Sequence, residues 1–415
     1  MSGLYFKSML VIIMIFCNFP LLQGQLLKSY LIGESDQVTI PFVYTNGFII
    51  VDVIFQKILP LKFIVDTGAE NTILLKREHA EMLNITYHKK IKLLGSDMSE
   101  EVHAYICNGS FLQLVNTRSV RHNIIVLEKD HLFLEEYIGS RVDGILGAEF
   151  FKGLIIRIDY KSSQLTIYDP LKFNTSKLKN YKTFDLEIIN NKPYINCITE
   201  ISSGTSVKTR LLIDSGAGLT ALFHHNTDTL LTMSDHIVKG SLGKGLGGDI
   251  EGYSGRIHRL NIGDLYFNNL LSSFQDLDET LIAKDKINRN GLIGNLLLER
   301  FDVIINLAHS KLYLKPKKNY NKTFEFDKSG LTLFAYGENL NKYYVKYVTE
   351  KSPAADADIR PGDIILKIGF FSYKWFTLRQ LNKLFIGKTG KKIKIKIQRG
   401  NEILKKEIIL RDLFK

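Results

Sequence analysis

Short apolar runs alternate with small polar clusters along most of the chain. Runs rich in Ile, Leu, Val, Phe and Tyr, such as residues 48–55, 155–160 and 257–262, are separated by clusters of Gly, Asn, Asp and Ser. Runs of this length between turn residues are typical of β-strands. Helical spacing is scarce and predicts short helices only near residues 76–84 and 296–300. The pattern therefore predicts a mainly β protein with antiparallel sheets.

Two segments recur farther along the chain. Residues 63–75, FIVDTGAENTILL, align with residues 211–223, LLIDSGAGLTALF, at an offset of 148 residues. A second pair of segments, 142–168 and 289–314, recurs at an offset of 147 residues. Two motifs that repeat at nearly one offset predict two homologous lobes. We place these lobes at residues 25–180 and 181–318.

The N-terminus has the pattern of a secretory signal peptide. Lys7 precedes an uncharged apolar run over residues 9–19, and polar residues follow at 23–25. We therefore expect residues 1–24 to be removed and the protein to be secreted or periplasmic. The apolar run is shorter than the roughly 20 residues of a transmembrane helix. An uncleaved membrane anchor remains an open alternative.

The positive charge of the chain is concentrated in its C-terminal segment. A length of 415 residues predicts about two to three domains. The net charge is +12, and residues 319–415, with 20 Lys and Arg against 10 Asp and Glu, carry +10 of it. The rest of the chain is nearly neutral, so the composition does not indicate an enzyme or binding protein of nucleic acids.

The cysteines are too few for a disulfide scaffold, since the chain has three. If Cys17 leaves with the signal peptide, Cys107 and Cys197 remain. We expect both to be buried and unpaired, although a disulfide between them stays open.

The repeated Asp-Thr/Ser-Gly-Ala sequence ends an apolar strand and begins a tight turn in each lobe. Gly68 and Gly216 have no Cβ, so the backbone can approach a partner closely there. The hydroxyl groups of Thr67 and Ser215 can form hydrogen bonds across to the other lobe. These four residues are expected to support the site that the two aspartates form.

Asp66 and Asp214 are the candidate catalytic residues. A single Asp at the end of a strand is more often a turn residue, but two in matched lobes are expected to meet at the lobe interface. Like charges a few Å apart share one proton, so such a pair supplies a general acid and a general base together. The ionised carboxylate would take a proton from water while the protonated one donates to a peptide carbonyl oxygen. The product is a tetrahedral gem-diol, formed without an acyl-enzyme.

These signatures resemble those of the aspartic proteases of the pepsin and retropepsin kind. The later apolar-apolar-Gly elements at residues 144–147 and 291–294 also fit, and the resemblance covers about residues 38–315. It implies a bilobal pepsin/retropepsin-like fold and aspartic-type endopeptidase (hydrolase) activity on a peptide or protein substrate, with no cofactor and no metal. Ala69 and Ala217 follow the signature glycines, which is closer to the retropepsins than to pepsin.

The flap that covers the cleft in that family has two candidates in this chain. One is a hairpin over residues 93–105, with Gly95 near its bend. The other is the glycine-rich segment 240–255, which includes Tyr253. The second also contains a G-x-G-x-x-G pattern, but no helix-forming stretch follows it, so we do not expect a dinucleotide site.

Residues 352–368, SPAADADIRPGDIILKI, resemble PDZ domains of the bacterial kind. The resemblance implies a PDZ domain, an α+β small β-barrel, over residues 319–415. It also places a carboxylate-binding loop for a C-terminal peptide ligand at Gly330, Leu331, Thr332 and Leu333. The basic run 388–406 alternates Lys with Ile, which predicts a solvated strand face and leaves an anionic partner as the alternative.

The sequence thus predicts a secreted aspartic endopeptidase whose PDZ domain binds chain ends of substrates or partners. The alternative is a non-catalytic protein in which the lobes and the PDZ domain only hold extended peptides. Both Asp-Thr/Ser-Gly signatures are intact, and this favours the enzyme.

Overall fold

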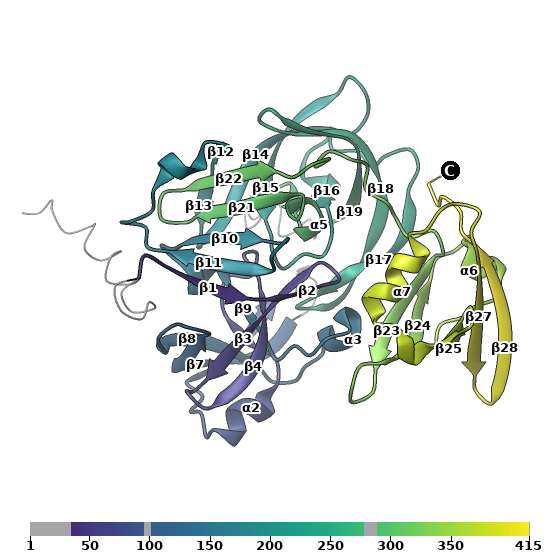
Figure 1. Cartoon of the computed structure of the whole chain (residues 1–415), viewed down its shortest axis with the longest axis horizontal. Coiled ribbons are helices and arrows are strands. Elements are labelled where there is room, and N and C mark those ends of the chain that lie inside the picture. Colours follow the sequence, from purple (N-terminus) through teal and green to yellow (C-terminus); the bar gives the residue numbers. More distant parts are fainter. Residues whose placement is uncertain (1–34, 95–100, 278–288, 415) are drawn as a thin grey trace, which may run out of the picture.

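The computed structural model describes residues 35–94, 101–277 and 289–414. Two β-rich lobes lie side by side, and a smaller C-terminal domain packs against them (Figure 1). The expected signal peptide lies outside the described residues. Within the described ranges, no helix is long and apolar enough to cross a membrane.

Lobe 1 is an eight-stranded sheet in the order β2-β3-β4-β9-β5-β8-β7-β6. Strands β4 and β9 run parallel, with Phe63 opposite Gly144. The sequence-predicted helix near residues 76–84 is present as α2. The elements of the lobe are β2 (Val43–Thr45), β3 (Phe48–Phe55), β4 (Leu59–Val65), β5 (Ile73–Leu74), α2 (Arg77–Met82), β6 (Lys89–Leu94), β7 (Glu101–Leu114), β8 (Val120–Leu127), α3 (Leu134–Ile138), β9 (Gly144–Leu146) and η1 (Ala148–Phe151).

Lobe 2 repeats this arrangement in the order β13-β14-β15-β20-β16-β19-β18-β17. Strands β15 and β20 again run parallel, with Leu211 opposite Gly291. A Cβ on Gly144 would clash with the Phe63 ring, and one on Gly291 would clash with the Leu222 carbonyl oxygen of β16, so only glycine fits at these two positions of β9 and β20. The elements are β13 (Glu187–Ile189), β14 (Lys192–Glu200), β15 (Ser206–Ile213), β16 (Ala221–His224), η3 (His225–Thr227), β17 (Val238–Gly245), β18 (Gly248–Ile262), β19 (Leu265–Gln275), β20 (Gly291–Ile293) and α5 (Asn295–Leu298).

A third sheet joins the two lobes, and the repeats did not predict it. Its order is β1-β11-β10-β21-β22-β12, and the pairing of β10 with β21 links the lobes. Arg157 makes two hydrogen bonds to Asp302 across this pairing, at 2.9 and 2.5 Å. One apolar core is continuous through both lobes. The elements are β1 (Gln37–Pro41), β10 (Ile155–Asp159), β11 (Gln164–Tyr168), η2 (Thr175–Leu178), β12 (Lys182–Asp185), β21 (Phe301–Asn306) and β22 (Lys311–Pro316).

The C-terminal domain has a sheet and an apolar core of its own. The apolar stripe of α7 is part of that core, and a capping box between Thr377 and Gln380 begins the helix. Along β27 the lysines are exposed or half-buried while the isoleucines are buried, which confirms the solvated strand face. The elements are β23 (Leu331–Tyr336), β24 (Lys342–Val348), α6 (Pro353–Asp356), β25 (Ile364–Ile368), β26 (Phe371–Ser372), η4 (Tyr373–Trp375), α7 (Leu378–Phe385), β27 (Lys392–Arg399) and β28 (Glu402–Ile409).

Candidate active site

The repeated turns after β4 and β15 lock the two lobes together. The Thr67 hydroxyl donates to the Ile213 carbonyl oxygen at 2.6 Å, and the Ser215 hydroxyl donates to the Val65 carbonyl oxygen at 2.9 Å. Each hydroxyl also accepts the backbone N–H of the other turn residue at 3.0 Å. Both side chains are fully buried. The hydrogen bonds expected across the lobes are therefore present in both directions.

The same turns bring Asp66 and Asp214 face to face. Asp66 Oδ1 accepts the N–H groups of Gly68 and Ala69, each at 2.8 Å, and Asp214 Oδ1 accepts that of Gly216 at 2.8 Å. A Cβ on Gly68 would lie 2.5 Å from the Asp214 carboxyl group, and one on Gly216 would clash with the Asp66 carboxyl group. Each glycine thus leaves the space that the carboxyl group of the opposite lobe occupies.

The surroundings of the pair favour one shared proton. Burial raises the pKa of Asp66, while its two backbone hydrogen bonds and the charge of Lys192 partly offset that rise. Burial also raises the pKa of Asp214, and the negative charge of Asp66 raises it further. Asp66 has more hydrogen-bond donors, so the negative charge is better stabilised there and the proton on Asp214.

Asn295 connects three parts of the site and was missed in the sequence. Its side-chain amide donates to the carbonyl oxygens of Gly47 at 2.7 Å and Ser215 at 2.5 Å, and its oxygen accepts the Tyr160 hydroxyl at 2.6 Å. The residue is fully buried. In the repeat alignment its counterpart in lobe 1 is Ala148, and this departure from the repeat is the only signal that could have indicated it.

A pocket of about 300 Å³ opens over the two carboxyl groups and is lined by both lobes. Leu132, Leu134 and Tyr137 form its apolar wall on the lobe 1 side. Apart from the two aspartates and Tyr137, the charged or titratable residues that line it are Glu70, Lys192, His224, Lys244 and Arg289. Burial lowers the pKa of His224 well below its ordinary value, so this imidazole is neutral near pH 7.

The glycine-rich hairpin of β17 and β18 lies over this pocket. Residues 242–246 and Ile250 line it, whereas Tyr253 does not. In lobe 1, β6 and β7 form the other expected hairpin, but the bend at Gly95 lies outside the described residues. Of the two expected hairpins, the lobe 2 hairpin is thus the one whose described residues line the pocket.

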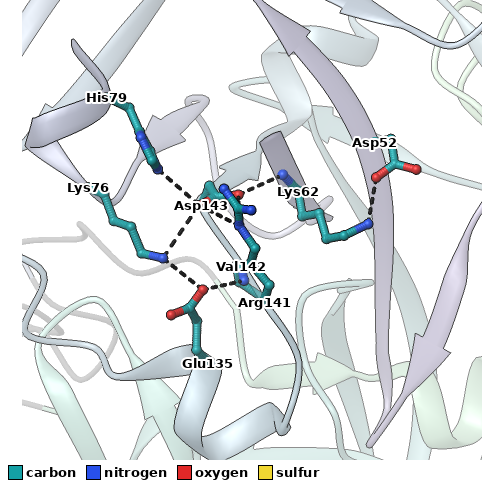
Figure 2. A network of polar contacts seen from close by, with 8 residues as sticks. All are labelled: Asp52, Lys62, Lys76, His79, Glu135, Arg141, Val142 and Asp143. Atoms are coloured by element: carbon teal, nitrogen blue, oxygen red, sulfur yellow. Dashed lines mark hydrogen bonds and ion pairs between the residues drawn. The ribbon is translucent and has the colours of Figure 1, made fainter. Parts of the chain in front are cut away.

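A charged network within lobe 1 surrounds Asp143, the residue directly before β9 (Figure 2). The Asp143 carboxylate is fully buried and accepts the Lys62 N–H at 2.9 Å. His79, Lys76 and Arg141 contact it at 3.0, 3.4 and 3.2 Å. Burial would raise the pKa of Asp143, but these hydrogen bonds and positive charges hold it at about 2. In lobe 2 the equivalent Asn290 accepts the Arg210 N–H at 2.9 Å, so the network supports the fold and carries no site of its own.

The proposed carboxylate-binding loop of the C-terminal domain is not open to a peptide, and this corrects the sequence-based expectation. The Gly330 N–H donates to Asp327 at 2.6 Å, and the Leu331 N–H donates to the Ser329 hydroxyl at 3.0 Å. Thr332 and Leu333 belong to β23, which packs against α3 of lobe 1. The Gly330 and Leu331 amides that a chain end would use are therefore already engaged, and α3 lies against β23.

Within the described ranges, no three or more His, Cys, Asp or Glu side chains gather in a way that could hold a metal ion. Cys107 and Cys197 are buried free thiols, as expected, and burial raises the pKa of both, to about 11 and about 12.

Comparisons with known proteins give one family match, and it falls on lobe 1. Residues 51–150 match the family model described as "Aspartyl protease". Among solved structures, the aspartic proteinase from Irpex lacteus is similar over 69% of this chain and 98% of its own chain, with 14% sequence identity and a TM-score of 0.42. A search of curated protein sequences finds no match.

Proposed function

We propose that this chain is an aspartic endopeptidase that hydrolyses peptide bonds with water activated between Asp66 and Asp214. The observation that carries the proposal is the mutual placement of the two turns. Each turn supplies one carboxyl group and donates a hydroxyl to the other lobe. The aspartyl protease match over residues 51–150 supports the same class of activity.

The proposed reaction uses the shared proton of the pair. A water between the carboxyl groups gives a proton to Asp66 as its oxygen attacks the peptide carbonyl carbon, and Asp214 gives its proton to the carbonyl oxygen. The gem-diol then collapses: Asp66 gives its proton to the leaving amine nitrogen, the C–N bond breaks, and Asp214 takes a proton from one gem-diol hydroxyl, which restores the starting pair. Gly68 and Gly216 leave the space in which the two carboxyl groups lie close together. The buried hydrogen bonds of Thr67 and Ser215 hold the two lobes in contact.

The test is cleavage of a peptide library from acid to neutral pH by the wild type, Asp66→Asn and Asp214→Asn, with cleavage sites read by mass spectrometry. Each variant should lose at least about 10³-fold in kcat, because neither carboxyl group can act as both acid and base. Asp52→Asn, at an exposed ion pair with Lys62, is the matched control and should keep normal activity. Near-normal turnover in either dyad variant would refute the assignment.

The same assay tests the alternative of a non-catalytic peptide-binding protein. A folded wild type that binds library peptides without cleaving them at any pH would favour that alternative.

The proposal includes export, with residues 1–24 as a signal peptide. Sequencing of the mature N-terminus should begin near residue 25, whereas an N-terminus at residue 1 would indicate an uncleaved anchor.

The proposal also assigns residues 319–415 to a PDZ-like class of domain. This assignment is supported by the sequence resemblance and by the order of α6, β25 and α7. Capture of chain ends is not part of it, because the loop amides are engaged.

A further inference from the structure

The C-terminal domain touches the elements that wall the cleft. β23 is the edge strand of its sheet, and α7 packs beside it. In Figure 1, α3 of lobe 1 and β17 of lobe 2 lie on the side of the domain that carries β23. Both elements contribute residues to the lining of the pocket above the two carboxyl groups.

On the lobe 1 side, the contact centres on Tyr137, which lines the pocket. Its ring lies between two others, with its centroid 5.6 Å from that of Phe334 and 6.0 Å from that of Phe48. Next to it, the Tyr344 hydroxyl donates to Glu136 at 3.0 Å. Phe334 and Tyr344 belong to the C-terminal domain, so that domain supports Tyr137, a residue of the cleft wall.

On the lobe 2 side, the contact centres on the β17–β18 hairpin. The Lys244 ammonium lies 2.6 Å from Asp249 and 5.6 Å from the centre of the Phe334 ring, and its side chain is 5% exposed. The Tyr347 hydroxyl is hydrogen-bonded to Asp249. Burial would raise the pKa of Asp249, but the hydrogen bonds from Lys244 and Tyr347 lower it below its ordinary value. The ion pair lies within the hairpin, and the hairpin is tied to the C-terminal domain by the contact of Lys244 with the Phe334 ring and by the interaction of Asp249 with Tyr347.

The groove between β23 and α7 is closed by lobe 1. Arg379 at the start of α7 donates to the Tyr44 carbonyl oxygen at 2.9 Å. Gly139, directly after α3, lies so close to Leu378 that an added Cβ would be 2.8 Å from the Leu378 Cβ. The domain thus holds a segment of its own chain where a PDZ-like groove would hold a peptide.

We infer that the C-terminal domain is a structural part of the substrate cleft, with Phe334, Tyr344 and Tyr347 as positioning residues for peptide binding. The inference rests on the proposed peptidase activity. Helix α3 has five residues and is too short to be stable alone, and a two-stranded hairpin is marginal by itself. Their positions depend on tertiary contacts, so the residues that hold them set the shape of the cleft.

The test compares paired variants of the full-length protein on a peptide of about eight residues that fills the cleft. Tyr344→Phe removes the hydrogen bond to Glu136, and Tyr343→Phe is its control, because the adjacent Tyr343 hydroxyl donates at 2.6 Å to Phe376 inside the domain. Phe334→Ala removes the ring behind Tyr137, and Phe371→Ala removes an exposed ring of the same domain.

We expect KM to rise about threefold to tenfold in Tyr344→Phe and more than tenfold in Phe334→Ala, with kcat changed less than KM. The controls should stay within twofold of the wild type in both constants. A kcat/KM for both test variants within twofold of their controls would overturn the inference.

Amide hydrogen exchange separates this result from a failure of the proposed activity. In Phe334→Ala, residues 132–139 and 238–255 should exchange faster than in Phe371→Ala, whether or not the wild type cleaves peptides. Unchanged exchange in both segments would refute the inferred support of the cleft by the C-terminal domain, even in an active enzyme. A wild type without peptidase activity but with the expected exchange would refute only the proposed function.

Discussion

Two basic side chains lie in the cleft beside the buried carboxyl pair. Lys192 lowers the pKa of Asp66, and Arg289 lowers that of Asp214, each against a larger rise that burial causes. Among the described residues, no hydrogen bond or ion pair to an acidic group engages the Lys192 ammonium. Its charge therefore acts mainly on the pair and on whatever occupies the pocket.

Replacing Lys192 with Met should shift the pH dependence of cleavage. Without the positive charge the Asp66 carboxyl stays protonated to a higher pH, so the acidic limb of kcat/KM should move up by roughly one pH unit. Lys152→Met, at an exposed position of lobe 1, should leave the limb in place. A limb that stays or moves to lower pH in Lys192→Met would contradict the role assigned to this charge.

Asp143→Asn should lower the stability of lobe 1. The amide oxygen can still accept the Lys62 N–H, as Asn290 does for Arg210, but Lys76 and Arg141 lose their counter-charge. We expect a free energy of unfolding about 2–4 kcal/mol lower in urea titrations at pH 7.

The pH dependence of this difference has a fixed sign. The folded-state pKa of Asp143 is about 2, below the ordinary carboxyl value of about 4. Its stabilisation is therefore complete above about pH 4 and is lost as the pH falls toward 2. Titrations at pH 5, 3 and 2 should show the gap between wild type and variant closing, and a gap that widened with acid would exclude this account.

Among the elements, the β17–β18 hairpin depends on glycines for its approach to α3. Gly243 has φ +144°, and an added Cβ would lie 3.3 Å from the Tyr137 hydroxyl oxygen. Gly248 on the same hairpin has φ +119° with nothing within 4 Å. The two positions share backbone strain, but only one contacts the cleft wall.

Gly243→Ala should therefore reduce kcat/KM more than Gly248→Ala does. The added methyl group presses the hairpin away from Tyr137, and we expect a loss of roughly tenfold against less than twofold for the control, with similar melting temperatures. Equal losses in the two variants would show that strain, and not the contact with Tyr137, controls the hairpin.

Some elements of the site could be predicted from the sequence, and others could not. The repeat predicted both turns that carry the aspartates. The hydrogen bonds of Thr67 and Ser215 across the lobes also follow from the repeat, because matched lobes related by symmetry must meet at matched turns. α3 lies outside the repeated segments, and Asn295 departs from its counterpart Ala148 within them. α3 takes its position from contacts with another domain, and Asn295 from a link between the lobes. The prediction for the loop at Gly330 was wrong because the sequence does not indicate that the Asp327 carboxylate accepts an N–H group of the loop.

At the scale of the whole molecule, the two lobes share one core while the C-terminal domain has its own. Differential scanning calorimetry should accordingly show one transition for residues 25–318 and a separate one for residues 319–415. If the C-terminal domain unfolds first, peptide cleavage should be lost with that transition, because the cleft loses its support. Three resolved transitions would mean that the lobes unfold independently and that the shared sheet is weaker than its pairing indicates.

The pairing of β10 with β21 also constrains how the chain acquires its fold during synthesis. The partner of β10 emerges about 145 residues later, as the Arg157–Asp302 contact across the two strands shows. Until then lobe 1 presents an unpaired apolar strand edge, which is a template for pairing with other chains. Lobe 1 expressed alone should therefore aggregate unless a matching strand is supplied.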